Sequence, residues 1–78
     1  MHFVYLLESH DKQHWYVGVT DDLRRRLLEH NAGHSIHTNK HKPWHIRTYT
    51  AFTNRHRAER FERYLKSHSG RVFTAKHF

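Results

Sequence analysis

Two apolar segments near the start of the chain predict a pair of neighbouring β-strands. Residues 3–8 form an almost uninterrupted run of aromatic, β-branched and leucine side chains, which is typical of a strand buried on both faces. Residues 15–20 form a second such run, and Gly18 within it indicates that another group comes close to the backbone. The polar residues 9–14 between the two runs predict a short hairpin loop.

Leucines spaced four residues apart predict a helix over residues 22–30. Thr20 or Asp21 is the expected N-cap, because their side-chain oxygens can accept a hydrogen bond from the first helical turn. Gly33 suits the left-handed residue that ends such a helix. A polar, basic connection follows as far as Pro43.

The second half of the chain predicts one more strand and one long helix. The pattern favours a strand over residues 44–52 and a helix over roughly residues 57–67, opened by Asn54 or Thr53. The apolar positions of that helix recur at three- and four-residue spacing, so they share one face.

The end of the chain is less regular. Gly70 is expected to break the helical pattern, and residues 71–78 read as a short strand or a packed arm. The predicted order is therefore β-β-α-β-α. This order favours an α+β fold, an α/β sandwich with a mostly antiparallel three-stranded sheet and flanking helices.

Composition narrows the class of protein. The 78 residues fit a single domain over residues 1–78, and 14 Lys and Arg against 7 Asp and Glu give a net charge of +7. Such a chain favours a polyanionic partner, most often a nucleic acid. No apolar run approaches the roughly 20 residues of a membrane span, and no signal-peptide pattern is present. We therefore expect a cytoplasmic protein with no membrane contact, and the absence of Cys excludes disulfides and thiolate metal sites.

Five side chains form a candidate catalytic set. Tyr5 and Tyr16 lie in adjacent predicted strands, and Arg26 and His30 lie four apart on one helix face. Glu62 falls on the face that should pack inward, where a carboxylate is costly unless it is paired or binds a metal. An Arg can neutralise charge on a scissile phosphate, a Glu can hold Mg²⁺, and a Tyr or His can help to remove a proton from water. The set suits phosphodiester hydrolysis.

Each of these side chains also has a purely structural interpretation. Arg26 and Glu62 could form an interhelical salt bridge, and the chemistry alone favours this about as much as a catalytic pairing. Tyr5 and Tyr16 could serve only as packing aromatics. His30 could interact with the dipole at the end of its helix.

Basic residues outside this set predict a surface that contacts phosphates. They are Arg24, Lys40, Lys42, Arg47, Lys66 and Arg71. Histidines between residues 34 and 45 have the spacing of metal ligands, but without Cys and in a polar loop we expect no structural zinc site. Trp15 and Trp44 are expected to pack against the rest of the fold.

Taken in order, several segments resemble a minimal GIY-YIG nuclease domain, of the kind found at the N-terminus of UvrC-type excinucleases. Residues 3–5 stand where the family has Gly-Ile-Tyr, and residues 16–18 where it has Tyr-Ile-Gly. Residues 23–31 resemble the Arg-bearing helix, residues 38–44 the approach to the third strand, and residues 58–66 the Glu helix. The chain looks most similar to the small stand-alone bacterial branch of the superfamily.

The resemblance implies a catalytic site and a reaction. Glu62 would be the ligand of a single Mg²⁺, with Mn²⁺ as a substitute, and Arg26 would contact the scissile phosphate. Tyr16, helped by Tyr5 or His30, would orient or deprotonate the attacking water. The implied activity is hydrolysis of phosphodiester bonds in DNA, during repair, recombination or DNA uptake. Whether the DNA is single-stranded, duplex or branched stays open.

Three features differ from the family pattern, and one of them is that the Asn found late in some members has no clear equivalent here. Phe3 replaces the Gly of the first motif, and Val19 stands where some relatives have Lys. Lys12, Lys66 or Arg24 could supply that charge instead.

Two functions without catalysis remain as alternatives. The basic surface could bind nucleic acid only, or the domain could recruit a protein partner in a repair complex. We expect a monomer or a weak dimer, because no exposed apolar stripe requires assembly.

Overall fold

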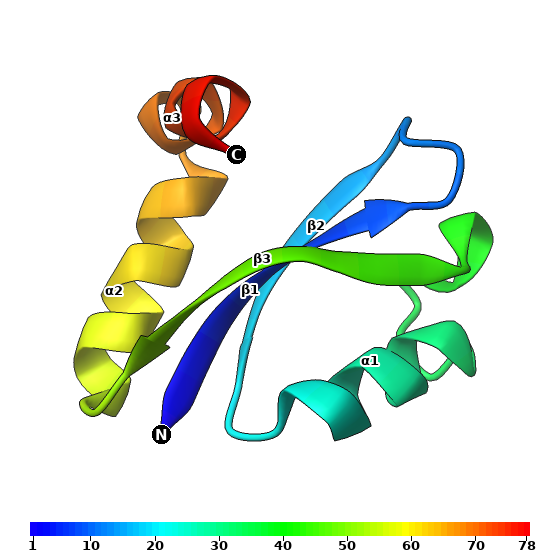
Figure 1. Ribbon diagram of the computed structural model, residues 1–78, viewed down its shortest axis with the longest axis horizontal. Helices are drawn as coiled ribbons and strands as arrows, with labels where there is room; N and C mark the ends of the chain where they lie inside the picture. The colour runs from blue at the N-terminus through cyan, green and yellow to red at the C-terminus, as the bar shows by residue number, and fades with distance from the viewer.

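A three-stranded antiparallel sheet organises the fold, in the order β2-β1-β3 (Figure 1). The computed structural model describes residues 1–78. Its strands are β1 (His2–Ser9), β2 (Trp15–Thr20) and β3 (Trp44–Phe52). The predicted α+β class and the β-β-α-β-α order are confirmed, and a further helix completes the chain.

The central position of β1 explains its apolar sequence. Every residue from Val4 to Ser9 is buried, because β1 has a strand on each side and helices over its faces. Tyr5 pairs with Gly18 of β2 and with Tyr49 of β3. The prediction of a first strand buried on both faces is therefore confirmed.

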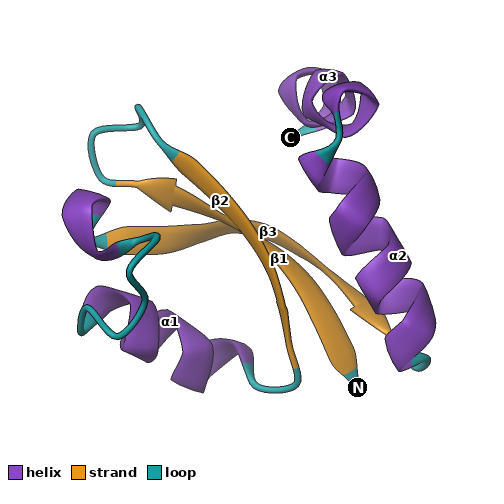
Figure 2. Cartoon of the chain, turned by 180° about the vertical axis from the view of Figure 1, so that it is seen from behind, coloured by secondary structure: helices purple, strands orange, loops and turns teal.

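The helices cover opposite faces of the sheet, with α1 (Leu23–Asn31) on one face and α2 (Arg55–Lys66) and α3 (His68–His77) on the other (Figure 2). Val4 packs against Ala58 and Leu65 of α2, whereas Tyr5 belongs to the core cluster that includes leucines of α1. Successive residues of β1 thus point to different helices, as the two-residue period of a strand requires.

Helix α1 begins one residue later than expected. Asp22, not Thr20 or Asp21, is the N-cap, and its Oδ1 accepts a hydrogen bond from the Arg25 N–H at 3.0 Å. Thr20 instead accepts a hydrogen bond from the Asp22 N–H at 3.1 Å, so it fixes the turn before the cap. At the other end, Gly33 has a φ of 83°, which confirms the predicted left-handed conformation.

The polar connection between α1 and β3 is anchored to the core. It contains the short 3₁₀-helix η1 (Asn39–His41) and the fully buried Thr38. The Trp44 indole Nε1 donates to the Thr38 carbonyl at 2.8 Å, and the Asn31 Nδ2 donates to the Trp44 carbonyl at 3.0 Å. Trp44 is buried, so its predicted packing role is confirmed.

Helix α2 starts and ends slightly earlier than the pattern indicated. Of the two expected N-caps, the structure uses Asn54, whose Oδ1 accepts from the Arg57 N–H at 3.1 Å. The helix has 12 residues and is the longest in the protein. None of the helices combines the length and apolar character needed to cross a bilayer.

The expectation of a C-terminal strand or arm was wrong, because residues 68–77 form α3. Ser67 is the N-cap, and its Oγ accepts a hydrogen bond from the Gly70 N–H at 3.1 Å. Gly70 does not break the helical structure. A Cβ at this position would lie 2.6 Å from the Leu65 Cα and overlap the Tyr64 carbonyl, so the missing side chain allows α3 to pack against the end of α2.

Candidate active site

A buried chain of hydrogen bonds joins three of the elements around the sheet. Tyr5 Oη lies 2.9 Å from His30 Nε2, and His30 Nδ1 lies 2.7 Å from Thr38 Oγ1. His30 and Thr38 are 0% exposed and Tyr5 is 2% exposed. The chain therefore fixes α1 and the connection after it against β1.

Burial keeps the members of this chain neutral. It lowers the pKa of His30, with a further contribution from the positive charge of Arg26. It also raises the pKa of Tyr5 to about 12, a rise that Arg26 opposes. A neutral imidazole donates from one nitrogen and accepts at the other. His30 can therefore relay a consistent hydrogen-bond direction between Tyr5 and Thr38.

Tyr16 stands beside this chain at the edge of the sheet. Its ring centroid is 6.5 Å from that of Tyr5 and 5.1 Å from that of His30. Because β2 is an edge strand, Tyr16 is only half-buried. The structure thus brings both tyrosines and the histidine together, with Tyr16 as the member that solvent can reach.

Arg26 lies one helical turn before His30 on α1 and is half-buried. Its Nη1 donates to Glu29 Oε1 at 3.0 Å, and this hydrogen bond raises the pKa of Arg26. Its charge acts on both Tyr5 and His30. Arg26 also lines a polar pocket of about 430 Å³ that lies between the end of β2 and the starts of α1 and α2.

Glu62 approaches the site from the opposite face of the sheet. Its side chain is 19% exposed, and its Oε2 accepts from the Lys66 Nζ at 3.0 Å. The structural alternative of an Arg26–Glu62 salt bridge is wrong, because Arg26 pairs with Glu29. The Glu62 charge still contributes to the raised pKa of Tyr5, so the two groups act on one another around the sheet edge.

Lys66 connects Glu62 to Tyr16. Its Nζ lies over the Tyr16 ring, 5.9 Å from the ring centroid, while it donates to Glu62. Of Lys12, Lys66 and Arg24, only Lys66 is placed beside Tyr16 by these contacts. The four-residue spacing from Glu62 is the helical spacing of an ion pair, and this signal was visible in the sequence.

The carboxylate at this site suits a metal ion with few protein ligands. No group of three or more His, Asp or Glu side chains comes together anywhere in the protein. Glu62 Oε1 makes no hydrogen bond within the protein, and the side chain is partly open to solvent. Mg²⁺ is bound in many sites through one or two carboxylates, with waters and substrate phosphates as the other ligands. The residues present therefore fit Mg²⁺.

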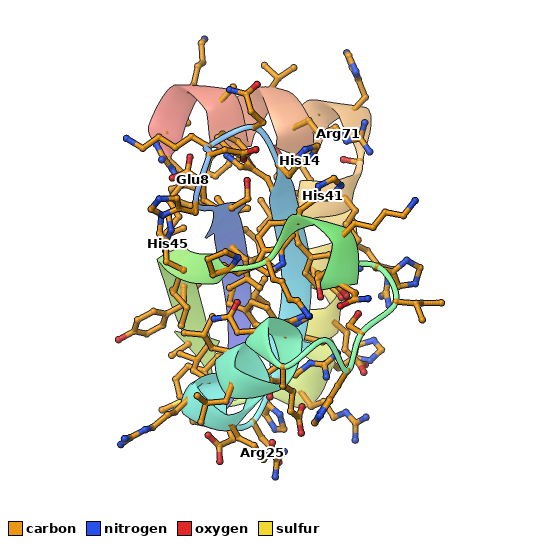
Figure 3. All side chains as sticks on the ribbon, turned by 90° about the vertical axis from the view of Figure 1, so that its right-hand side faces the viewer. Glu8, His14, Arg25, His41, His45 and Arg71 are labelled. Atoms are coloured by element: carbon orange, nitrogen blue, oxygen red, sulfur yellow. The ribbon has the colours of Figure 1, made fainter.

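The histidines with metal-ligand spacing have other contacts. His41 stacks on His14 with ring centroids 3.5 Å apart, and the Nε2 of His45 lies 3.2 Å from Glu8 Oε1 (Figure 3). His34 and His37 are exposed on the connection. The spacing along the chain does not converge on one point in space.

The predicted phosphate-contacting residues are distributed over different surfaces. Arg24, Lys40 and Lys42 lie on α1 and the connection that follows it, and all three are exposed. Lys66 and Arg71 line a second pocket beside Tyr16.

Arg47 is already engaged elsewhere. It bonds to Glu8 at 3.1 Å and to the carbonyl of Phe78 at 2.9 Å. Burial alone would raise the pKa of Glu8, but the hydrogen bond from Trp15 and the charges of Arg47 and His45 outweigh it and lower that pKa.

Trp15 differs from its expected packing role. Its side chain stays 43% exposed, although its Nε1 donates to Glu8 Oε2 at 3.1 Å. The two tryptophans differ in burial. Trp44 is buried under the connection, whereas Trp15 lies on the edge strand of the sheet and is partly exposed.

Comparison with known proteins identifies the family. A model described as the GIY-YIG catalytic domain matches residues 1–76. The UPF0213 protein VNG_2274C of Halobacterium salinarum is 37% identical over 67 residues, covering 85% of this chain and 86% of the relative. The UPF0213 protein BH0048 of Halalkalibacterium halodurans is 35% identical over 71 residues, covering 90% of this chain and 74% of the relative.

A solved structure agrees with these matches. The solution NMR structure of the UPF0213 protein BH0048 from Bacillus halodurans has a TM-score of 0.57 and 31% sequence identity in the superposition. The match covers 96% of this chain and 82% of that one. The family model spans nearly all of the sequence, and the two tyrosines, the arginine and the histidine of the expected motifs meet at one edge of the sheet. The chain therefore belongs to the GIY-YIG nuclease family.

Proposed function

We propose that the protein is a Mg²⁺-dependent DNA endonuclease that hydrolyses phosphodiester bonds, with Glu62 as the one protein ligand of the ion. The observation that carries this proposal is the meeting of Glu62, Tyr16 and the Tyr5–His30 pair around the edge of β2. The Glu62 carboxylate comes from one face of the sheet, and the neutral, hydrogen-bonded Tyr5–His30 pair comes from the other. Between them lies Tyr16, the one tyrosine of the two that solvent can reach. The basic charge of the chain favours a polyanionic substrate.

The geometry supports different roles for the two tyrosines. Tyr5 is protonated at neutral pH, since its pKa is about 12, and both His30 nitrogens are already hydrogen-bonded. In this proposal Tyr5 and His30 therefore hold neighbouring groups in position and do not take the proton from the attacking water. Tyr16 is the side chain that can meet the attacking water, and in this proposal it orients the water or accepts its proton.

Charge neutralisation comes from Arg26 and from the ion. Arg26 is held by Glu29 on the α1 side of the site, where it can face a phosphate oxygen. Mg²⁺ bound at Glu62 would supply positive charge for the phosphate and for the leaving oxygen. Lys66 holds Glu62 in place and adds a positive charge next to Tyr16.

The proposed DNA contacts extend from this site over cations that solvent can reach. They are Arg24, Lys40, Lys42, Lys66 and Arg71. Arg47 is left out of the surface because Glu8 and the Phe78 carbonyl already occupy its guanidinium.

A cleavage assay tests the proposal. Labelled single-stranded, duplex and branched DNA would be incubated with Mg²⁺, with Mn²⁺ and with EDTA, using the full chain and its Glu62→Gln variant. Loss of the only protein metal ligand should lower metal-dependent cleavage by at least ~100-fold, because a metal supplies several kcal/mol of transition-state stabilisation. DNA binding should remain, since Gln removes a negative charge.

Glu59→Gln is the matched control. Glu59 lies three residues earlier on α2, pairs with Arg55 and undergoes the same change of charge. We expect this variant to cleave like the unchanged protein. Salt-sensitive DNA binding without cleavage of any substrate by the unchanged protein, with either ion, would contradict the proposal and favour a binding module.

A further inference from the structure

A pocket of about 440 Å³ opens beside Tyr16, between β2 and the corner where α2 meets α3. Its floor is apolar and consists of Leu6, Val17 and Leu65. Leu6 and Leu65 are almost completely buried, so the floor belongs to the rigid core. The volume lies in the range of pockets that hold small organic ligands, and such pockets combine an apolar lining with a few polar groups.

An anchored aromatic side chain forms one wall of this pocket. Trp15 lines it and remains 43% exposed. Its ring is held by the hydrogen bond from Nε1 to Glu8 Oε2 and by Arg47, whose guanidinium carbon lies 5.4 Å from the ring centroid. An exposed aromatic that is already fixed loses little entropy when a planar group stacks on it. Tyr16 adds a second aromatic surface.

Two cations also line the pocket. Lys66 and Arg71 both border the pocket, and no acidic side chain does. Arg71 is exposed on α3 and forms no salt bridge within the protein. The complementary ligand therefore combines a planar, partly apolar body with negative charge.

The pocket is continuous with the site proposed above. Tyr16 and Lys66 belong to both, and Lys66 binds Glu62 directly. The polar pocket that contains Arg26 borders the other end of β2, at Val19 and Thr20. Along the edge of β2 the surface thus changes from a polar pocket, past Glu62, to an apolar and aromatic pocket.

We propose that the apolar pocket is a nucleobase subsite, which receives the base of a nucleotide next to the scissile phosphate. The base stacks on Trp15, its edge rests on the apolar floor, and its phosphate faces Lys66 and Arg71. Stacking on an aromatic ring tolerates every base, because each base has a π-face. The inference rests on the proposed function, and it adds a place for one base outside the double-helical stack.

Nucleotide binding tests this subsite without requiring cleavage. Deoxyadenosine monophosphate would be titrated into the full chain without metal, and amide chemical shifts recorded by NMR. Shifts should concentrate on β2 and on the start of α3. Deoxyribose 5-phosphate, which has the same charge and no base, should produce no comparable shifts. Equal binding of the two compounds would show an anion site and overturn the inference.

Variants locate the ligand. Trp15→Ala should weaken nucleotide binding by about 5- to 150-fold, the range expected for loss of one stacking partner. Arg71→Gln should also weaken it, whereas Lys76→Gln, which removes one positive charge from the same helix outside the pocket, should not. Thermal unfolding of each variant would show that the fold is kept, and Arg71→Gln keeps the test available if Trp15→Ala unfolds.

The outcome is separable from that of the nuclease assay. Glu62→Gln should still bind the nucleotide, and at least as tightly as the unchanged protein, because Glu62 does not line the pocket and its loss releases Lys66 from an ion pair. Nucleotide binding without cleavage by the unchanged protein would leave the subsite standing while the nuclease proposal fails. No shifts at millimolar nucleotide, or equal affinity of Trp15→Ala and the unchanged protein, would overturn the subsite while the cleavage assay stands on its own.

Discussion

Gly18 lies directly opposite Tyr5 in the β1–β2 ladder, and its missing side chain makes room for the tyrosine ring. A Cβ at Gly18 would be 2.5 Å from the Tyr5 Cζ and would overlap the hydroxyl oxygen. The glycine therefore lets the Tyr5 hydroxyl reach the buried side chain of His30 on α1. In the Tyr-Val-Gly motif, Tyr16 contributes its side chain to the site, and Gly18 contributes the space that its missing side chain leaves for Tyr5.

Substitution of Gly18 by Ala should consequently damage the site. The added methyl group must displace the Tyr5 ring, and such overpacking costs about 1–3 kcal/mol. We expect the melting temperature to fall by at least ~5 °C. DNA cleavage, under the proposed function, should fall with it. Thermal unfolding followed by circular dichroism is the measurement, and an unchanged melting temperature would show that Tyr5 does not need this space.

Thr38 should prove to be a positioning residue for His30. In Thr38→Val the side-chain volume is kept, but His30 Nδ1 loses its partner in a fully buried place. A buried polar atom left without a partner costs about 1–3 kcal/mol. Thr38→Ser, which keeps the hydroxyl, should retain most of the stability and most of the activity. Equal urea midpoints for the Thr38→Val and Thr38→Ser variants would contradict this role.

Protonation of His30 should destabilise the fold in mild acid. Burial lowers the pKa of His30 in the folded protein below the ordinary value of 6.5. At pH values between the folded-state pKa and 6.5, the unfolded chain binds more protons than the folded protein does. The free energy of unfolding therefore decreases as the pH falls below about 6.5. The decrease ends below the folded pKa. Comparing unfolding free energies of the unchanged protein and His30→Gln from pH 5 to 8 isolates this effect, since the other histidines are common to both. Parallel pH profiles would exclude His30 as the source.

Gly70→Ala should loosen the C-terminal helix. The new methyl group would overlap the Tyr64 carbonyl, which is backbone and cannot rotate away. We expect α3 to detach or shift, with a stability loss of about 1–3 kcal/mol or more. Ser69→Ala is the control, because Ser69 is exposed and adjacent. Limited proteolysis should cut the Gly70→Ala variant between α2 and α3 first; resistance equal to that of the control would contradict this view of the helix junction.

The sequence predicted most of the fold because its signals are local. The continuous apolar run of β1, the leucine spacing of α1 and the cap at Asn54 each depend on neighbouring residues, and each agrees with the structure. The end of the chain was predicted wrongly for a complementary reason. Gly70 looks like a helix breaker. In the structure its missing side chain instead leaves room for a backbone carbonyl of another helix, and no local pattern reveals that contact.

The five candidate site residues could be chosen from the sequence, but their contacts could not. The sequence left a catalytic role for Arg26 and a salt bridge with Glu62 equally open. In the structure α1 and α2 lie on opposite faces of the sheet (Figure 1), Arg26 pairs with Glu29, and Glu62 pairs with Lys66. The pocket beside Tyr16 likewise requires α3 to fold back over β2, so that Arg71 and Trp15 line the same space.

The order of residues was thus sufficient to specify the strands and the first two helices, and to select the candidate site residues. These follow from periodicity, caps and residue chemistry, which act over a few residues. The pairing of charges, the hold of Thr38 on His30 and the pocket next to Tyr16 became visible only once the chain was folded. The pocket joins residues distant in the chain. The Arg26–Glu29 and His30–Thr38 contacts join residues closer in sequence, and the packing of α1 and its connection against the sheet selects them.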